Sequence, residues 1–174
     1  AEIEAAAREH GVDADLVEAV VMTESAGLAH AYRYEPEFWR RYLEGKPQWI
    51  GANPRRVSAS FGLMQVMFPV AVELGYVGAP EGLFVPSVAL DVGCQKLAEL
   101  LKWSGGNVDA ALASYNGGKV GNSAPPYRNN AYVVKVQANG VAIAPLFLTE
   151  ILPLGVTFIA NSQTPPWNCV VSTP

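Results

Sequence analysis

The chain has 174 residues, of which half are hydrophobic and 16% are charged, and its net charge is −4. This composition excludes an intrinsically disordered chain, and the length suits one globular domain with a sizeable core. Because no run of basic residues occurs, we expect neither a nucleic acid nor an acidic membrane surface as the partner.

Helical segments separated by turn residues make up most of the chain. Gly11 follows the first segment as a favourable C-terminal cap, and Asp13, Ser87 and Asn107 stand where a side-chain oxygen can cap the following helix. We interpret "KPQWIGANPRR", residues 46–56, as a loop. The predicted helices are 1–10, 14–25, 35–45, 68–76, 85–106, 107–118 and 128–140.

A glutamate interrupts the apolar pattern of the second predicted helix, "ADLVEAVVMTES". Leu16, Val20 and Glu24 are four positions apart, so they share one face of the helix. A surface glutamate would be misplaced on such a stripe. We therefore expect Glu24 to lie against an apolar wall.

The C-terminal segment 139–174 has a different character. Residues 141–160, "VAIAPLFLTEILPLGVTFIA", include one charged residue and are long enough to span a bilayer. Two prolines, a glycine and Glu150 argue against a span, and the β-branched residues favour extended structure. We expect this tail to pack on the domain or to lead to a partner, with membrane contact as the alternative.

The cysteines and histidines give no sign of a metal or cofactor site. Cys94 lies in an apolar helical run and is interpreted as a small buried hydrophobe, with a disulfide to Cys169 in an oxidising compartment as the alternative. His10 and His30 are isolated from other residues at ligand spacing. We therefore expect no metal and no cofactor.

Four sequence fragments occur together in a known order. They are "TESAG" (23–27), "SFGLMQV" (60–66), "ALASYNGG" (111–118) and "YVVKV" (132–136). With them the chain resembles the lysozyme-like lytic transglycosylases, the soluble-lytic-transglycosylase catalytic domain related to goose-type lysozyme, over roughly residues 2–138. The resemblance implies a mainly α, lysozyme-like (α+β lysozyme superfamily) domain with a cleft in residues 1–138, and cleavage of the MurNAc–GlcNAc bond of peptidoglycan.

The resemblance names Glu24 as the catalytic acid, and physical chemistry supports that role. Cleavage of a glycosidic bond needs an acid that stays protonated near neutral pH to donate to the leaving oxygen. Burial against an apolar wall raises the pKa of a carboxyl group, because it disfavours the charged form. The stripe of Leu16 and Val20 gives Glu24 such a setting.

The other fragments supply the expected cleft. The resemblance implies that Ser60, Gly62, Met64 and Gln65 line it, with Gly62 admitting a close approach of the sugar and Gln65 suited to an acetamido group. Tyr115, Asn116 and Tyr132 would surround the glutamate: the tyrosines hold it and the asparagine binds substrate. Core packing is the alternative for Met64 and the tyrosines.

The chain departs from the common family pattern between the first two fragments, where a short loop is usual. The inserted "RYEPEFW", residues 33–39, is similar to a segment of phage and related bacterial members that act as muramidases. Glu35 is therefore a candidate second catalytic carboxylate. The alternative is a structural charge at a helix N-terminus, where the helix dipole favours an anion by a few tenths to about 1 kcal/mol.

Three functions remain open for the sequence. A lytic transglycosylase would use Glu24 as acid and then as base, leaving 1,6-anhydro-MurNAc ends on its partner, the glycan strand. The alternatives are a muramidase using Glu24 and Glu35, and a non-catalytic cell-wall-binding module. Because peptidoglycan lies outside the cytoplasm, we expect a location in the periplasm, cell wall, extracellular space or a phage virion, and a monomer or a domain of a larger protein.

Overall fold

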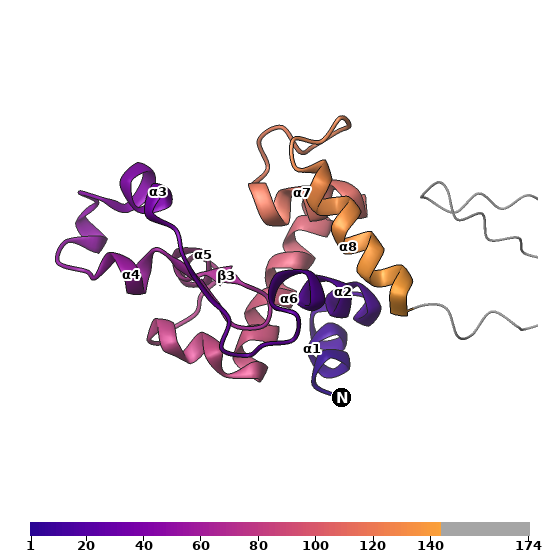
Figure 1. Ribbon diagram of the computed structural model, residues 1–174, viewed down its shortest axis with the longest axis horizontal. Helices are drawn as coiled ribbons and strands as arrows, with labels where there is room; N and C mark the ends of the chain where they lie inside the picture. The colour runs from indigo at the N-terminus through magenta and orange to yellow at the C-terminus, as the bar shows by residue number, and fades with distance from the viewer. Residues whose placement is uncertain (144–174) are drawn as a thin grey trace, which may run out of the picture. The chain divides into compact units, whose positions relative to one another are not determined.

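Helices dominate the computed structural model, which describes residues 1–143 (Figure 1). The α-helices are α1 Glu2–His10, α2 Ala14–Ser25, α3 Pro36–Phe38, α4 Pro54–Val57, α5 Phe68–Glu73, α6 Pro86–Trp103, α7 Val108–Gly117 and α8 Asn130–Ile143. Three further turns are the π-helical η1 Trp39–Leu43 and the 3-10 helices η2 Pro47–Trp49 and η3 Pro80–Phe84. The expectation of a mainly helical domain is confirmed. Cys169 and most of the apolar stretch 141–160 lie outside the described residues.

The helix ends follow local capping chemistry. Gly11 ends α1 with φ 65°, and Asp13 and Asn107 accept 3.0 Å hydrogen bonds from the amides of Leu16 and Ala110. The prediction that Ser87 caps α6 is wrong. The helix already starts at the preceding residue, Pro86, because its fixed φ suits the first turn, so Ser87 lies inside that turn and caps nothing.

The segment interpreted as a loop holds two short helical turns. The prediction for residues 46–56 is therefore wrong for η2 and for α4, which Asn53 caps by accepting a 3.0 Å hydrogen bond from the Arg55 amide. The predicted helix 35–45 forms as the short α3, which continues into the π-helical turn η1. These turns stand on the far side of the sheet from α7 and α8 (Figure 1).

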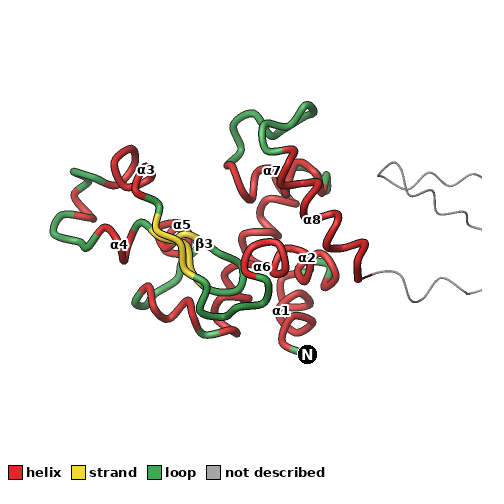
Figure 2. Tube along the Cα trace, in the orientation of Figure 1, coloured by secondary structure: helices red, strands yellow, loops and turns green. Residues whose placement is uncertain are grey.

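A small antiparallel sheet joins these turns to the main group of helices (Figure 2). Its strands are β1 Tyr32–Tyr34, β2 Ala59–Phe61 and β3 Val66–Met67, in that order. In the central strand, Ser60 pairs with Arg33 on one side and with Met67 on the other. The register therefore places the inserted Arg33 next to the "SFGLMQV" fragment.

The core lies among α1, α2, α6, α7 and α8, which pack against one another. Its most enclosed side chains, Val17, Val20, Leu97, Leu112 and Val136, are at most 1% exposed. Each contributes about 1.5–3 kcal/mol relative to an exposed position. This core fixes α2 against α8, and the site described below depends on that arrangement.

Cys94 is completely buried in α6, and burial raises the pKa of its thiol to about 12. This placement agrees with the interpretation of Cys94 as a small core residue. Among residues 1–143, no helix combines the length and the apolar character that crossing a bilayer needs.

Candidate active site

The last turn of α2 carries Glu24, and its neighbour anchors that turn. The Ser25 hydroxyl donates to the carbonyl of Leu63 at 2.8 Å, which ties the end of α2 to the turn between β2 and β3. Left-handed backbone at Ala26 (φ 53°) and Gly27 (φ 78°) then ends the helix. The "TESAG" fragment thus fixes the position of a carboxyl group relative to the sheet.

Glu24 is partly buried and accepts one strong hydrogen bond. The Tyr132 hydroxyl on α8 donates to Glu24 Oε1 at 2.7 Å. Burial raises the pKa of Glu24 above its ordinary value, while the Tyr132 hydrogen bond and the charge of Lys96 oppose that rise. Burial therefore acts in favour of the protonated form of Glu24, whereas Tyr132 and Lys96 act in favour of its carboxylate.

The pocket around this carboxyl group collects residues from the sheet and from three helices. Its described lining contains one carboxyl group, that of Glu24. The other lining residues are Arg33, Ser60, Gln65, Met67, Lys96, Tyr115 and Asn116. Sequence reasoning named Ser60, Gln65, Tyr115 and Asn116 but not the two cations.

Gln65 lines the pocket, but its side-chain amide is engaged within the protein. Its Nε2 donates to the carbonyls of Ala31 and Gly62 at 2.9 and 3.0 Å, and its Oε1 accepts from the Ser60 hydroxyl at 3.0 Å. Gln65 also adopts a left-handed backbone, with φ 46°. It therefore organises the turn after β2 and retains one acceptor lone pair for a ligand.

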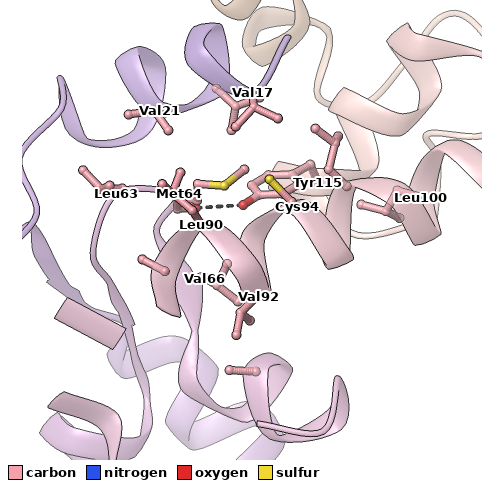
Figure 3. Packing of buried hydrophobic residues seen from close by; sticks show 14 of the residues in the cluster. Val17, Val21, Leu63, Met64, Val66, Leu90, Val92, Cys94, Leu100 and Tyr115 are labelled. Atoms are coloured by element: carbon pink, nitrogen blue, oxygen red, sulfur yellow. Dashed lines mark hydrogen bonds between the residues drawn. The ribbon is translucent and has the colours of Figure 1, made fainter. Parts of the chain in front are cut away.

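The structure places Gly62 and Met64 differently from the expectation. A Cβ atom at Gly62, whose φ is 69°, would fall on the carbonyl oxygen of Leu83, so the glycine is needed for packing inside the protein. Met64 is completely buried, and a Cβ at Gly93 of α6 would collide with its side chain. Met64 is a core residue because the turn after β2 points inward at this position (Figure 3).

The Tyr115 hydroxyl also has a different partner from the expected one. It donates to the Met64 carbonyl at 2.8 Å, as Figure 3 shows, and not to Glu24. Tyr115 is 4% exposed, and burial raises the pKa of its hydroxyl well above the ordinary value. Of the two expected tyrosines, Tyr132 contacts the glutamate and Tyr115 holds the wall of the pocket.

Lys96 places a half-buried cation in this wall. Its Nζ donates to the backbone carbonyl of Tyr115 at 2.8 Å and lies 3.8 Å from the centre of that ring. Burial lowers the pKa of Lys96 to about 8, and the charge of Glu24 opposes the shift. Val92, Lys96 and Leu100 repeat the four-residue spacing that singled out Glu24, so the same signal could have identified this lysine.

Glu35 does not reach the pocket, but its ion-pair partner does. Its carboxylate pairs with Arg33 Nε at 2.5 Å, and its backbone amide donates to the Ser58 carbonyl at 2.8 Å. The carboxylate makes no hydrogen bond to the first turn of α3, although Glu35 directly precedes that helix. The insertion therefore contributes the Arg33 guanidinium group to the pocket lining, and the ion pair with Glu35 positions that group.

Asn116 lies at the exposed end of α7, on the pocket wall. Its Oδ1 accepts a 2.9 Å hydrogen bond from Nδ2 of Asn129, a residue that sequence reasoning did not single out. Within residues 1–143, no group of three or more His, Cys, Asp or Glu side chains is arranged to hold a metal ion.

A helical domain with a three-stranded sheet and an enclosed glutamate beside it has the lysozyme-like architecture. The family model described as "Transglycosylase SLT domain" matches residues 2–130, and the chain belongs to this family. The resemblance stated from the sequence fragments is thereby confirmed.

Solved structures show the same fold. An inactive mutant of the lytic transglycosylase Slt from Pseudomonas aeruginosa matches with a TM-score of 0.60 and 20% identity, over 80% of this chain and 23% of that chain. The 70 kDa soluble lytic transglycosylase SLT70 from Escherichia coli matches with a TM-score of 0.53 and 20% identity, over 74% of this chain and 21% of that chain. The chain thus corresponds to less than a quarter of either structure.

Proposed function

We propose that this domain is a lytic transglycosylase that cleaves the β-1,4 bond between MurNAc and GlcNAc in peptidoglycan. The observation that carries the proposal is the pocket with one carboxyl group, in which Glu24 is enclosed and receives the Tyr132 hydrogen bond. The common inverting and retaining hydrolases use a second carboxyl group, about 6.5–9.5 Å from the acid for inversion and about 5–5.5 Å for retention. The candidate for that role, Glu35, is instead paired with Arg33 outside the described lining.

One carboxyl group suffices for the proposed reaction. Protonated Glu24 donates its proton to the glycosidic oxygen as the bond from C1 breaks, and the departing GlcNAc keeps that proton. The Glu24 carboxylate then takes the proton of the MurNAc C6 hydroxyl, whose oxygen bonds to C1 and closes the 1,6-anhydro ring. Glu24 ends protonated, and no water is consumed. Tyr132 and the charge of Lys96 stabilise the carboxylate between the two steps.

A role of the pocket wall in holding the glycan is supported by its polar lining, which includes Ser60, Gln65, Tyr115 and Asn116. The family membership supports peptidoglycan strands as the partner. Because that polymer lies outside the cytoplasm, the proposed site of action is the periplasm, the cell wall, the extracellular space or a phage particle.

Digestion of purified peptidoglycan followed by mass spectrometry tests the proposal. The wild-type protein should release fragments that end in 1,6-anhydro-MurNAc, and Glu24→Gln should release none while keeping the far-UV circular dichroism of the wild type. Reducing MurNAc ends would identify a muramidase. Binding without any product would identify a non-catalytic cell-wall module.

A further inference from the structure

Three asparagine side chains form a continuous hydrogen-bond chain that ends in the pocket. Asn122 is completely buried, Asn129 is partly buried, and Asn116 is exposed on the pocket wall. Asn122 Nδ2 donates to Asn129 Oδ1 at 3.2 Å, and Asn129 Nδ2 donates to Asn116 Oδ1 at 2.9 Å. The chain therefore links the interior of the loop after α7 to a residue that faces the ligand space.

Backbone groups fix the direction of the first amide in this chain, that of Asn122. The backbone N–H of Asn129 donates to Asn122 Oδ1 at 3.0 Å, so that oxygen must be the acceptor end. At the other end of the same side chain, Nδ2 donates to the Gly118 carbonyl at 2.8 Å, which can only accept. Asn122 therefore cannot be turned over without losing both bonds.

The orientation of the Asn122 amide determines that of the Asn116 amide through Asn129. Because Asn122 presents its NH2 group to Asn129, Asn129 must accept with Oδ1 and donate with Nδ2. Asn116 then accepts with Oδ1, and its own NH2 group has no acceptor among residues 1–143. Tight packing supports this arrangement, since a Cβ atom at Gly117 would collide with the Asn129 amide.

We infer that Asn129 is a positioning residue that sets the amide of Asn116 as a hydrogen-bond donor toward an acceptor oxygen of the bound glycan. The fixed amide of Asn122 sets the orientation of the Asn129 amide, which in turn sets the orientation of the Asn116 amide. Asn116 makes the contact with the glycan. The inference rests on the proposed function, because it assumes that a glycan occupies the pocket. It also assigns a direction to the hydrogen bond between Asn116 and the glycan. The Asn116 NH2 group donates, so its partner on the glycan is a sugar oxygen that accepts a hydrogen bond.

The test is a comparison of Asn129→Asp with Asn129→Ala, using soluble peptidoglycan glycan strands and the rate of formation of new chain ends. Aspartate keeps the size of asparagine and still accepts from Asn122, but it offers Asn116 only an acceptor. Asn116 must then turn over and present its oxygen to the glycan. Alanine only frees Asn116 to sample both orientations. We expect Asn129→Asp to raise KM about tenfold and Asn129→Ala to raise it about threefold, with kcat little changed in both.

A merely structural role predicts the opposite order. Alanine would be the worse variant, because it removes Asn129 Oδ1 and so leaves one of the two amide hydrogens of the buried Asn122 without an acceptor. Aspartate would be nearly neutral. The matched control is Asn130→Asp, which adds the same charge at the next, exposed position and should keep the wild-type KM. Wild-type KM in Asn129→Asp, or a larger increase in Asn129→Ala, would overturn the inference.

A double-mutant cycle distinguishes an effect on KM that acts through the Asn116 amide from other effects of substituting Asn129. In an Asn116→Ala background, Asn129→Asp should cause no further rise in KM, because its effect passes through the removed amide. Additive effects would contradict the inference. If Asn129→Asp does not fold, Asn116→Asp gives the same polarity reversal on an exposed residue and should raise KM similarly; a wild-type KM there would also overturn it. The type of chain end formed by the wild type tests the proposed function independently of these KM values.

Discussion

The hydroxyl of Tyr132 and the carboxyl group of Glu24 meet at 2.7 Å although 108 positions separate the two residues in the chain. Helix α8 carries the tyrosine, α2 carries the glutamate, and the packing of these two helices creates the contact. This donor both orients the proposed catalytic carboxyl group and stabilises its charged form.

Removing that donor should change the pH dependence of the activity. The Tyr132 hydrogen bond lowers the pKa of Glu24, so Tyr132→Phe should raise it further. Because proton donation needs protonated Glu24, the alkaline limb of the kcat/KM profile should move to higher pH. We expect kcat to fall roughly tenfold through loss of orientation. An alkaline limb that stays in place or moves to lower pH would contradict this role.

Lys96 should make stability depend on pH in a defined window. Burial lowers its folded-state pKa to about 8 from 10.5, so between these values the unfolded state binds more protons and stability rises with pH. Relative to Lys96→Met, the free energy of unfolding of the wild type should therefore increase from pH 8 to pH 10.5, by at most about 3 kcal/mol. Urea denaturation of both proteins at several pH values measures this difference. A difference that is constant across the window would show that burial does not lower the pKa of Lys96.

Gly62 should tolerate a side chain much less well than a glycine of similar backbone geometry. Gly62 and Gly11 have φ values of 69° and 65°, but only at Gly62 would a Cβ atom meet other atoms, including the Leu83 carbonyl oxygen. Gly11→Ala should cost about 1–2 kcal/mol of backbone strain, and Gly62→Ala about 2–4 kcal/mol more. Thermal unfolding of the two variants provides the measurement. Equal losses would indicate that the turn after β2 relaxes freely.

Glu35 should be dispensable for the chemistry. Its carboxylate pairs with a largely exposed Arg33, and such pairs contribute about 0–1 kcal/mol. Glu35→Gln should therefore retain most of kcat and the same type of chain end, with a small rise in KM if Arg33 loses its position. A loss of activity comparable with that of Glu24→Gln would make Glu35 a second catalytic carboxylate and would favour the muramidase.

Local patterns predicted the helices and the enclosed glutamate, because apolar spacing and capping act over a few residues. The stripe of Leu16, Val20 and Glu24 predicted an apolar setting for the glutamate, and Gly11 and Asp13 marked helix ends. The expected role of Glu24 as the acid came from the family resemblance. Lys96 has the same spacing from apolar residues, but this spacing does not by itself predict a buried lysine, since lysines in helices ordinarily lie at the surface.

Contacts between distant segments explain the remaining differences. Nothing near Met64 in the sequence indicates that α6 leaves room for it at Gly93, or that its carbonyl takes the Tyr115 hydroxyl. Likewise, the role of Asn129 depends on how the loop after α7 returns to the end of that helix. Such partners are set by tertiary packing, and a pattern in one segment does not reveal them.

In the proposed reaction Glu24 is the only catalytic carboxyl group, and no water takes part. Digestion of peptidoglycan in oxygen-18-enriched water tests it most directly, with mass spectrometry of the earliest new chain ends. We expect 1,6-anhydro-MurNAc ends without the heavy isotope from the wild type, and no products at all from Glu24→Gln. Reducing MurNAc ends that carry oxygen-18 would contradict it, because their formation requires an activated water at this site.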